Sequence, residues 1–495
     1  MRTLHFALSA LLWASVLTST QAQTGDLPRT LPERCGISSY EIVRLTDSLM
    51  ALPKTSIHSL MVLRHDSVVG EVYPAPWSRE SMHTMYSCSK TFVSAAVGMA
   101  IGDGKLKLDS RVADFFPKSF NRSANYKRMT VRHLLTMASG IEPDWEMRNN
   151  GDQWCKTWLG KPVAMPGKQF KYDSMCTYLL SVIVEKAVGT KLLDYLKARL
   201  FNPMHITEVE WETSPEGFNT GGWGLRIQTE SLAKFGLLLL HDGAWHGRQL
   251  IPADWAKAMK EKQIDNGAFG YGYQMWCCEY QGASRADGAY GQYILIIPDK
   301  DMVAVVTECT AIDGINQRRL FWRQLLPTVA DKALAPAVAP ELYTRRMNGY
   351  ELTPAQGKAI GGCLQAPLCL SLGKNQLGWS EISVQRSTRP GEIVFSYVQG
   401  GDTVTLNLYN NVWTTVRTPV TPVYSVEARG RFNGLSRNFD VAGSYGVTGD
   451  TLHIALQYAG WVTTLNLDIP LDGPDGSIKV TRNHEQAATV ATSRK

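Results

Sequence analysis

The sequence has no strong excess of charge of either sign. Its 495 residues contain 51 Lys and Arg against 45 Asp and Glu, a net charge of +6, with no run of five or more like charges. Nucleic-acid-binding domains usually carry a clustered basic surface. The composition therefore gives no support for a nucleic-acid partner, and 44% hydrophobic and 19% charged residues are ordinary for a globular protein.

Long apolar runs are also scarce. One such run, residues 6–17, follows Arg2, and small residues then occupy the −3 and −1 positions of a cut after Ala22. This pattern is typical of a cleavable secretory signal. No other stretch approaches the roughly 18 apolar residues of a membrane-spanning helix, and no cysteine next to the cut supports a lipid anchor. We expect a periplasmic or secreted protein with no stable membrane anchor.

The nine cysteines form no paired Cys-x-x-Cys and no Cys/His spacing typical of zinc. The cysteines therefore predict no zinc site. An odd number leaves at least one thiol free, or paired with another chain, in an oxidising compartment. Cys363 and Cys369 are spaced to close a short loop, but the pairing stays open.

The pattern of helices and strands changes near residue 330. Before residue 330, helical and strand patterns are mixed. An almost wholly apolar stretch at 87–101 predicts a buried helix, and the segments 60–73, with a break at Gly70, and 293–307 each predict two paired strands. After an Ala/Pro-rich stretch, short β-rich runs indicate a separate antiparallel sheet or barrel. We predict an α+β fold with a helical region packed on an antiparallel sheet, followed by a small all-β domain. The expected divisions are a signal peptide at 1–22, a catalytic domain at 30–330, a linker at 331–345, a barrel-like domain at 346–481 and a disordered tail at 482–495.

The predicted strands of the C-terminal domain are short and regularly spaced. Gly-Gly-Asp and Gly-Asp turns separate some of them. They fall at 393–398, 403–409, 413–417, 423–432, 438–445, 451–458 and 462–469.

A Ser-x-x-Lys motif opens the apolar helix at Ser87 and Lys90. Positions i and i+3 share a helix face, so the lysine can take the serine proton if burial keeps it neutral. Two further copies start at Ser231 and Ser371, but the first can sit on a solvent-facing helix side and the second contains Gly373, which disfavours a helix. The context selects Ser87 as the nucleophile.

Two more segments supply chemistry. Pro166-Gly167 makes a turn that places Tyr172 in a loop before a helix, where a phenol can relay protons; packing at the helix entrance is the alternative. The segment Ala286–Gln292 carries glycines beside a strand, where backbone N–H groups can stabilise an oxyanion. A plain hairpin turn is the alternative there.

The order and spacing of these elements resemble the class C β-lactamase and D,D-peptidase group, especially its esterase and 6-aminohexanoate-dimer hydrolase branch. The resemblance covers roughly residues 35–330 and implies no metal or organic cofactor. His133 falls in a stretch that is structural in that group. The matching segments are the nucleophile helix, Gly102 to Asp109, Val131 to Gly140, the Pro-Gly-x-x-Phe-x-Tyr segment ending at Tyr172, Gly221 to Leu225, and Gly291-Gln292.

The resemblance assigns roles to individual residues. Ser87 would be the acylated nucleophile, Lys90 its base partner and Tyr172 the proton relay. The backbone N–H groups of Ser87 and Ala289 would form the oxyanion hole. Residues expected to bind substrate or line the cleft are Ser174, Gly222, Trp223, Asp287 and Gly288.

Two departures from the family pattern affect the substrate. The usual Tyr-x-Asn is Tyr172-Asp173-Ser174, and the Lys/His-Thr/Ser-Gly strand motif is Ala286-Asp287-Gly288. The cation and hydroxyl that receive a β-lactam carboxylate are therefore missing, and an inward-pointing Asp287 would repel it by about 4 kcal/mol at 4 Å and an effective dielectric of 20. Other cations for that carboxylate would be Arg285, Lys168 or Lys171.

The sequence thus predicts an exported serine hydrolase that cleaves a small-molecule ester, amide or short peptide through an acyl-serine intermediate. One alternative keeps the chemistry but changes the substrate: a β-lactamase, D,D-peptidase or D-aminopeptidase. The other is a non-catalytic penicillin-binding-like sensor or binding protein. The presence of Ser87, Lys90 and Tyr172 together disfavours the last.

Overall fold

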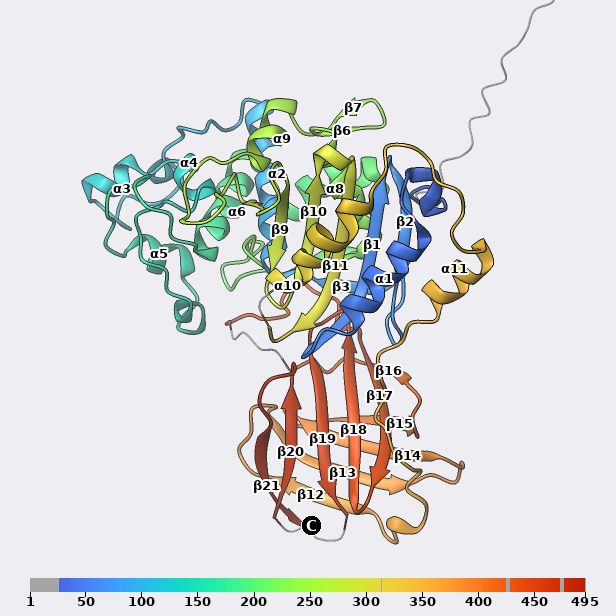
Figure 1. The fold of residues 1–495 in the computed structure, drawn as a ribbon. Coiled ribbons are helices and arrows are strands. Elements are labelled where there is room, and N and C mark those ends of the chain that lie inside the picture. The colour runs from blue at the N-terminus through green and yellow to red at the C-terminus, as the bar shows by residue number, and fades with distance from the viewer. Residues whose placement is uncertain (1–25, 313, 424–427, 472–475, 495) are drawn as a thin grey trace, which may run out of the picture.

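The computed structural model describes residues 26–312, 314–423, 428–471 and 476–494. It has an α+β body formed by the N-terminal two thirds of the chain and a β-barrel formed by the rest (Figure 1). The predicted signal peptide, 1–22, lies outside the described residues.

A six-stranded antiparallel sheet is the centre of the α+β body. In β1 (Thr55–Arg64), Met61 and Leu63 pack into one hydrophobic core while Leu60 and Val62 pack into the other, because alternate side chains of a strand point to opposite faces. The strand order is β2 (Ser67–Val72), β1, β11 (Met302–Thr310), β10 (Gln292–Ile297), β9 (Ser284–Gly288) and β8 (Trp276–Cys277).

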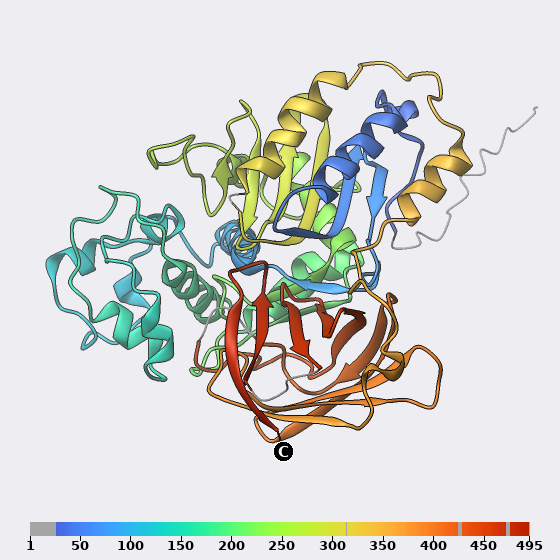
Figure 2. The ribbon, with the colours of Figure 1, turned by 60° about the horizontal axis from the view of Figure 1, so that its bottom comes forward.

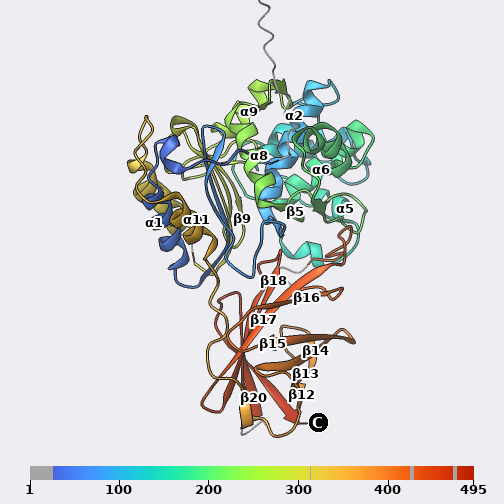
Figure 3. The ribbon, with the colours of Figure 1, turned by 90° about the vertical axis from the view of Figure 1, so that its right-hand side faces the viewer.

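Helices cover both faces of this sheet (Figure 3). One face carries α1 (Ser39–Met50) and α11 (Pro340–Asn348), and the other carries α8 (Thr229–Leu240), α2 (Ser89–Gly102) and α6 (Ser174–Val188). The predicted arrangement of helices packed on an antiparallel sheet is confirmed.

The turn between β1 and β2 lies at His65 and Asp66, both with positive φ, so the predicted break at Gly70 is wrong. Gly70 lies inside β2. A Cβ there would lie 2.8 Å from Cγ2 of Ile42 on α1, so glycine allows α1 to pack closely on the sheet.

The helical region agrees with the apolar pattern at 87–101. Helix α6 ends at Gly189, whose φ of 77° is left-handed. Helix α2 is buried on all sides, as its composition predicts. The remaining helices are α3 (Ala124–Arg128), α4 (Val131–Leu135), α5 (Trp154–Leu159), α7 (Leu192–Leu196), α9 (Ala253–Lys260) and α10 (Ile315–Leu320).

Two smaller sheets complete the α+β body. The three-stranded sheet carries the segment that leads to Ser87. Its order is β3 (Met82–Thr84), β5 (Leu225–Gln228) and β4 (Val209–Trp211), and β6 (Ala244–Trp245) pairs with β7 (Arg248–Gln249).

The C-terminal domain is a nearly closed antiparallel barrel around its own hydrophobic core (Figure 2). Inside it, the hydroxyls of Tyr397 and Tyr458 are hydrogen-bonded at 2.8 Å. The strand order is β15 (Asp402–Tyr409), β14 (Glu392–Gln399), β13 (Trp379–Arg386), β12 (Leu368–Leu372), β21 (Ala488–Arg494), β20 (Gly476–Arg482), β19 (Thr464–Pro470), β18 (Thr451–Ala459), β17 (Phe439–Thr448) and β16 (Thr414–Thr418).

Three expectations for the C-terminal part need correction. The tail at 482–495 is not disordered over its described residues, because β21 pairs with both β12 and β20. The linker at 331–345 runs into α11, whose Tyr343 hydroxyl donates to Val69 O at 2.6 Å. The run at 423–432 forms no strand in its described part; residues 428–436 make a loop instead.

The barrel docks on the α+β body through backbone hydrogen bonds. Gly460 O accepts from Thr84 N at 2.8 Å, immediately before the segment that carries Ser87. In the loop at 428–436, Arg429 N donates to Arg148 O at 2.9 Å, and Asn433 O accepts from Thr213 N at 2.9 Å. The barrel is therefore in direct contact with segments that surround the predicted catalytic residues.

Candidate active site

Ser87 lies in a 3₁₀ turn, Tyr86–Cys88, that leads directly into α2. Tyr86 has a left-handed backbone with φ of 45°, an uncommon conformation that is often retained at functional sites. Lys90 Nζ lies 2.9 Å from Ser87 Oγ. The i, i+3 geometry expected from the Ser-x-x-Lys motif is present.

Lys90 is buried among three hydrogen-bonding oxygens. Its side-chain nitrogen contacts Ser87 Oγ and Ser174 Oγ, each at 2.9 Å, and donates to Gly222 O at 2.6 Å. Burial lowers the pKa of Lys90 to about 7, and the positive charge of Arg148 acts in the same direction. Near neutral pH a large fraction of Lys90 is therefore neutral and able to accept the Ser87 proton.

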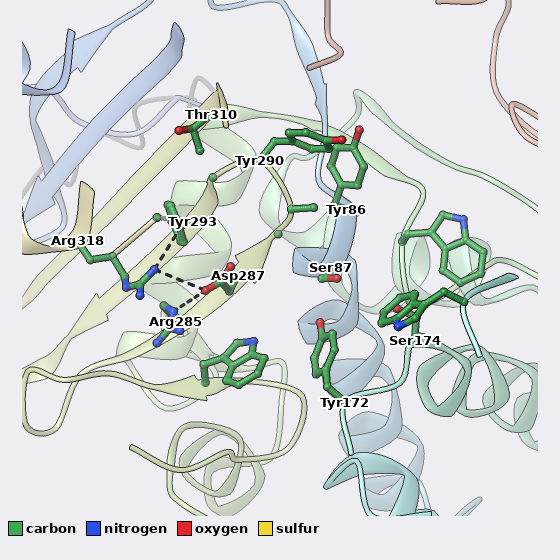
Figure 4. Close-up of a pocket in the computed structure, with 18 of the residues that line it drawn as sticks. Tyr86, Ser87, Tyr172, Ser174, Arg285, Asp287, Tyr290, Tyr293, Thr310 and Arg318 are labelled. Carbon is green, nitrogen blue, oxygen red and sulfur yellow. Dashed lines mark hydrogen bonds and ion pairs between the residues drawn. The ribbon is translucent and has the colours of Figure 1, made fainter. Parts of the chain in front are cut away.

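Tyr172 lies beside the start of α2, with its hydroxyl toward Ser87 (Figure 4). The two side chains are hydrogen-bonded, and burial raises the pKa of Tyr172 well above its usual value. Lys90 Nζ lies 5.1 Å from the centre of the Tyr172 ring. A phenol that keeps its proton can donate to an oxygen at Ser87.

The two residues after Tyr172 have different tasks. Asp173 caps α6 by accepting from Met175 N and also accepts from Trp158 Nε1, both at 2.8 Å. Ser174, where the family pattern has asparagine, contacts Lys90 and also lines the cavity. This departure from the pattern therefore keeps a polar partner for the lysine.

A cavity of about 700 Å³ opens in front of Ser87. Apart from Lys90, which contacts Ser87 but is not in the cavity wall, every residue predicted for the site lines the cavity. They are Ser87, Tyr172, Ser174, Gly222, Trp223, Asp287, Gly288 and Ala289.

The end of β9 passes very close to the nucleophile segment. A Cβ on Gly288 would lie 2.4 Å from Met85 O, so only glycine permits this approach. Ala289 follows in the turn between β9 and β10 and lines the same cavity as Ser87. This arrangement is compatible with the predicted oxyanion hole, whose assignment stays a prediction.

Asp287 forms ion pairs with two arginines. It is therefore not the unpaired negative charge that the sequence alone suggests. Its Oδ2 lies 2.7 Å from Arg285 Nε and 3.9 Å from a terminal nitrogen of Arg318 (Figure 4). Arg318 in turn lies 3.7 Å from Glu279. Asp287 does line the cavity, but its negative charge is balanced there.

Several residues of the cavity wall were not predicted. Trp145, Arg148 and Trp276 extend the aromatic and cationic lining, and Arg431 reaches it from the barrel. Arg431 is held by Glu212 at 3.0 Å. No sequence pattern identifies Arg431, because only the tertiary fold brings it to the site.

Comparison with known proteins agrees with the fold. A family model described as Beta-lactamase matches residues 44–309, more than half of the chain. The chain belongs to the β-lactamase family.

Individual relatives of this β-lactamase family member are distant. It is 24% identical over 298 residues to a 6-aminohexanoate-dimer hydrolase of Paenarthrobacter ureafaciens, covering 53% of this chain and 75% of that protein. It is 24% identical over 314 residues to penicillin-binding protein 4 of Amycolatopsis lactamdurans, covering 54% and 82%. A solved structure of SurE with D-Leu covers 85% of this chain and 98% of its own, with 18% identity and a TM-score of 0.50, and so resembles the fold including the barrel.

The other two Ser-x-x-Lys copies do not form comparable pairs in this family member. Ser231 and Lys234 are buried rather than solvent-facing, which corrects the sequence reading; Lys234 Nζ donates to Met204 O at 3.1 Å and His205 O at 3.3 Å. Ser371 lies in a strand, β12. His133 accepts from Thr130 N at 3.0 Å and caps α4, a structural task.

The remaining cations and thiols do not extend the site. Lys171 pairs with Glu142 on the surface, and Lys168 and Lys171 do not line the described cavity. All nine cysteines lie in described residues and none forms a disulfide, including Cys363 and Cys369. Within the described ranges, no group of three His, Cys, Asp or Glu could hold a metal ion, and no helix is long and apolar enough to cross a membrane.

Proposed function

We propose that this protein is a serine hydrolase that cleaves an ester or small amide through an acyl-Ser87 intermediate. Neutral Lys90 accepts the Ser87 proton while Ser87 Oγ attacks the substrate carbonyl. Tyr172 passes a proton to the leaving group, and the same groups then activate the water that releases the acyl chain.

The contact of Lys90 with Ser87 carries this proposal. A lysine placed 2.9 Å from a serine hydroxyl, with a pKa lowered to about 7, is suited to act as a base at neutral pH. Membership of the β-lactamase family supports it, as does the similarity to a 6-aminohexanoate-dimer hydrolase. The intact set of Ser87, Lys90 and Tyr172 disfavours a non-catalytic binding protein.

The oxyanion hole of the proposal uses the backbone N–H groups of Ser87 and Ala289. Both residues line one cavity, and both follow shortly after the residues of the close approach, Gly288 and Met85. Two fixed donors of this kind stabilise the charge that develops on the carbonyl oxygen.

The substrate that we propose is an ester or small amide with an aromatic or apolar part. Tyr86, Trp145, Trp223, Trp276 and Tyr290 line the cavity and suit such a group. Asp287 occupies the strand position at which the family pattern has a hydroxyl. Its ion pair with Arg285 also makes this arginine less available to a substrate. This disfavours strong binding of a β-lactam carboxylate.

A second substrate class is favoured by one observation. Arg318 lines the cavity. Its guanidinium nitrogens lie 3.7 Å from a carboxylate oxygen of Glu279 and 3.9 Å from one of Asp287. These ion pairs are weaker than the 2.7 Å pair of Arg285 with Asp287. A carboxylate of a D-peptide or β-lactam would find a cation there. The alternative of a D,D-peptidase, D-aminopeptidase or β-lactamase therefore rests on Arg318.

A substrate panel tests the proposal. Wild-type protein and Ser87→Ala are assayed with p-nitrophenyl esters, D-amino-acid amides and nitrocefin, and labelled with a serine-reactive phosphonate. The proposal expects ester or amide turnover and labelling by the wild type alone. Binding without turnover or labelling would favour the non-catalytic alternative, and a clear preference for nitrocefin would favour the second substrate class.

The cellular location belongs to the proposal as well. The apolar run at 6–17 and the small residues Thr20 and Ala22, at the −3 and −1 positions of the cut, support export to the periplasm or medium. N-terminal sequencing of the protein recovered from culture fractions tests it. A mature chain starting at Gln23 is expected, and a chain that keeps residues 1–22 in the cytoplasm would contradict export.

A further inference from the structure

Gln292, the first residue of β10, is completely buried and uses both ends of its side-chain amide. Its Nε2 donates to Ala289 O at 3.1 Å and to Glu308 O at 2.7 Å. Its Oε1 accepts from Glu308 N at 3.3 Å. One side chain thus fastens the turn before β10 to the neighbouring strand β11.

The turn that Gln292 holds has an uncommon backbone. Tyr290 has φ of 63° and Gly291 has φ of 91°, two left-handed residues in succession. A left-handed non-glycine residue costs on the order of 1–3 kcal/mol and persists where surrounding contacts determine it. The bonds from Gln292 to Ala289 O and from Thr310 N to Tyr290 O, the latter at 3.2 Å, supply such contacts.

The main chain of Gln292 is also tied to the nucleophile segment. Its carbonyl oxygen accepts from Cys88 Sγ at 3.2 Å, and Cys88 follows Ser87 directly. In the sheet, Gln292 is the partner of Gly288 in the β9–β10 ladder. Gln292 therefore contacts the carbonyl group of Ala289 through its side chain, and Cys88, the neighbour of Ser87, through its backbone.

We propose that Gln292 is a positioning residue that fixes the Ala289 N–H relative to Ser87 for stabilisation of the oxyanion. The inference rests on the proposed hydrolase function and deepens it. Gln292 itself does not line the described cavity and so touches no substrate; it acts by holding the Ala289 carbonyl, which fixes the position of Ala289 in the turn and with it the direction of the Ala289 N–H.

The test needs a readout that general destabilisation does not change. Thionoesters place sulfur where an ester has its carbonyl oxygen, and an oxyanion hole built for oxygen discriminates against them. The ratio of kcat/KM for a p-nitrophenyl ester to that for its thiono analogue therefore reports the hole. It is measured for wild type, Gln292→Met, which keeps the side-chain length without the hydrogen bonds, and Gln292→Asn, which keeps the amide but shortens its reach.

Gln274 provides a matched control. It is also buried, donates to Leu134 O at 3.1 Å and Leu135 O at 2.8 Å, and accepts from Thr177 Oγ1, but it holds the helical region rather than the oxyanion turn. Gln274→Met removes a similar set of buried hydrogen bonds. Thermal melts of all the variants report their loss of stability separately.

The inference expects Gln292→Met to lower kcat for the ester about 10- to 100-fold with little change in KM, and to reduce the ester-to-thionoester ratio about 10-fold. Gln292→Asn should change in the same direction, and Gln274→Met should keep the wild-type ratio. A wild-type ratio in both Gln292 variants, or an equal loss in Gln274→Met, would overturn it. Wild-type protein inactive on every ester and amide would instead refute the proposed function, a different result.

Discussion

Arg285 Nε lies 2.7 Å from Asp287 Oδ2 inside the candidate active site. The pair converts the acidic residue of the Ala286-Asp287-Gly288 segment from an isolated charge into a neutralised one. Because Arg285 already pairs with Asp287, it can bind a substrate carboxylate only weakly, and this affects specificity.

Asp287→Asn should therefore improve the handling of β-lactams. Removing the carboxylate releases Arg285 and strengthens the positive potential around Arg318, so kcat/KM for nitrocefin should rise about 10-fold relative to that for a p-nitrophenyl ester. Asp299→Asn, a change at an exposed carboxylate bonded to Tyr280, is the control. An unchanged ratio in Asp287→Asn would mean that the pair does not set the preference.

The double variant Ala286→Lys, Asp287→Thr restores the family cation and hydroxyl. We expect wild type to prefer the ester over nitrocefin and the double variant to reduce that preference. Steady-state kinetics with both substrates check this. A wild type that already prefers nitrocefin would show that Arg318 or Arg285 receives the carboxylate.

The lowered pKa of Lys90 predicts the pH dependence of activity. Below a pH of about 7 Lys90 is mainly protonated and cannot accept the Ser87 proton, so kcat/KM should rise through an acid limb with an apparent pKa near 7 and level off above it. A pH profile with a neutral ester measures this. A limb near the usual value of a lysine, or no limb between about pH 5 and 9, would contradict the role of Lys90 as a base.

Lys90→Ala and Tyr172→Phe should each reduce kcat steeply, by roughly 10²–10⁴-fold, because each removes a positioned proton-transfer group. Circular dichroism should show an intact fold. Near-wild-type turnover in Tyr172→Phe would leave the tyrosine a packing role against Trp276, whose ring centre lies 5.2 Å away.

Arg431 tests the contribution of the barrel. Arg431→Gln removes the ion-pair partner of the buried Glu212 and should cost about 3 kcal/mol of stability. It should also raise KM for bulky esters, since Arg431 lines the cavity. Arg437→Gln, at an exposed residue directly after the loop that carries Arg431, should change neither the melting temperature nor KM. Adding Glu212→Gln to Arg431→Gln should recover part of the stability. An unchanged melting temperature and an unchanged KM in Arg431→Gln would show that the barrel does not contribute to the site through Arg431.

Much of the fold and site follows from local sequence patterns. The apolar stretch after Ser87 predicts a buried helix, and the Tyr172 and Gly288 segments match turns beside it, so the residues around Ser87 could be predicted. The roles of Arg285 and Arg318 do not follow from local patterns, because they depend on ion pairs with Asp287 that only the three-dimensional fold creates. For 488–494 the sequence predicts a disordered tail, because the segment is polar and alternates weakly. Pairing with β12 and β20 orders it as β21.

Trapping the acyl group tests the central claim most directly. Wild-type protein is reacted with a fluorophosphonate, digested and mapped by mass spectrometry, with Ser231→Ala, Ser371→Ala and Ser87→Ala in parallel. The account predicts one adduct, on Ser87, which persists in the first two variants and disappears in the third. An adduct on Ser231 or Ser371, or labelling that survives Ser87→Ala, would contradict it.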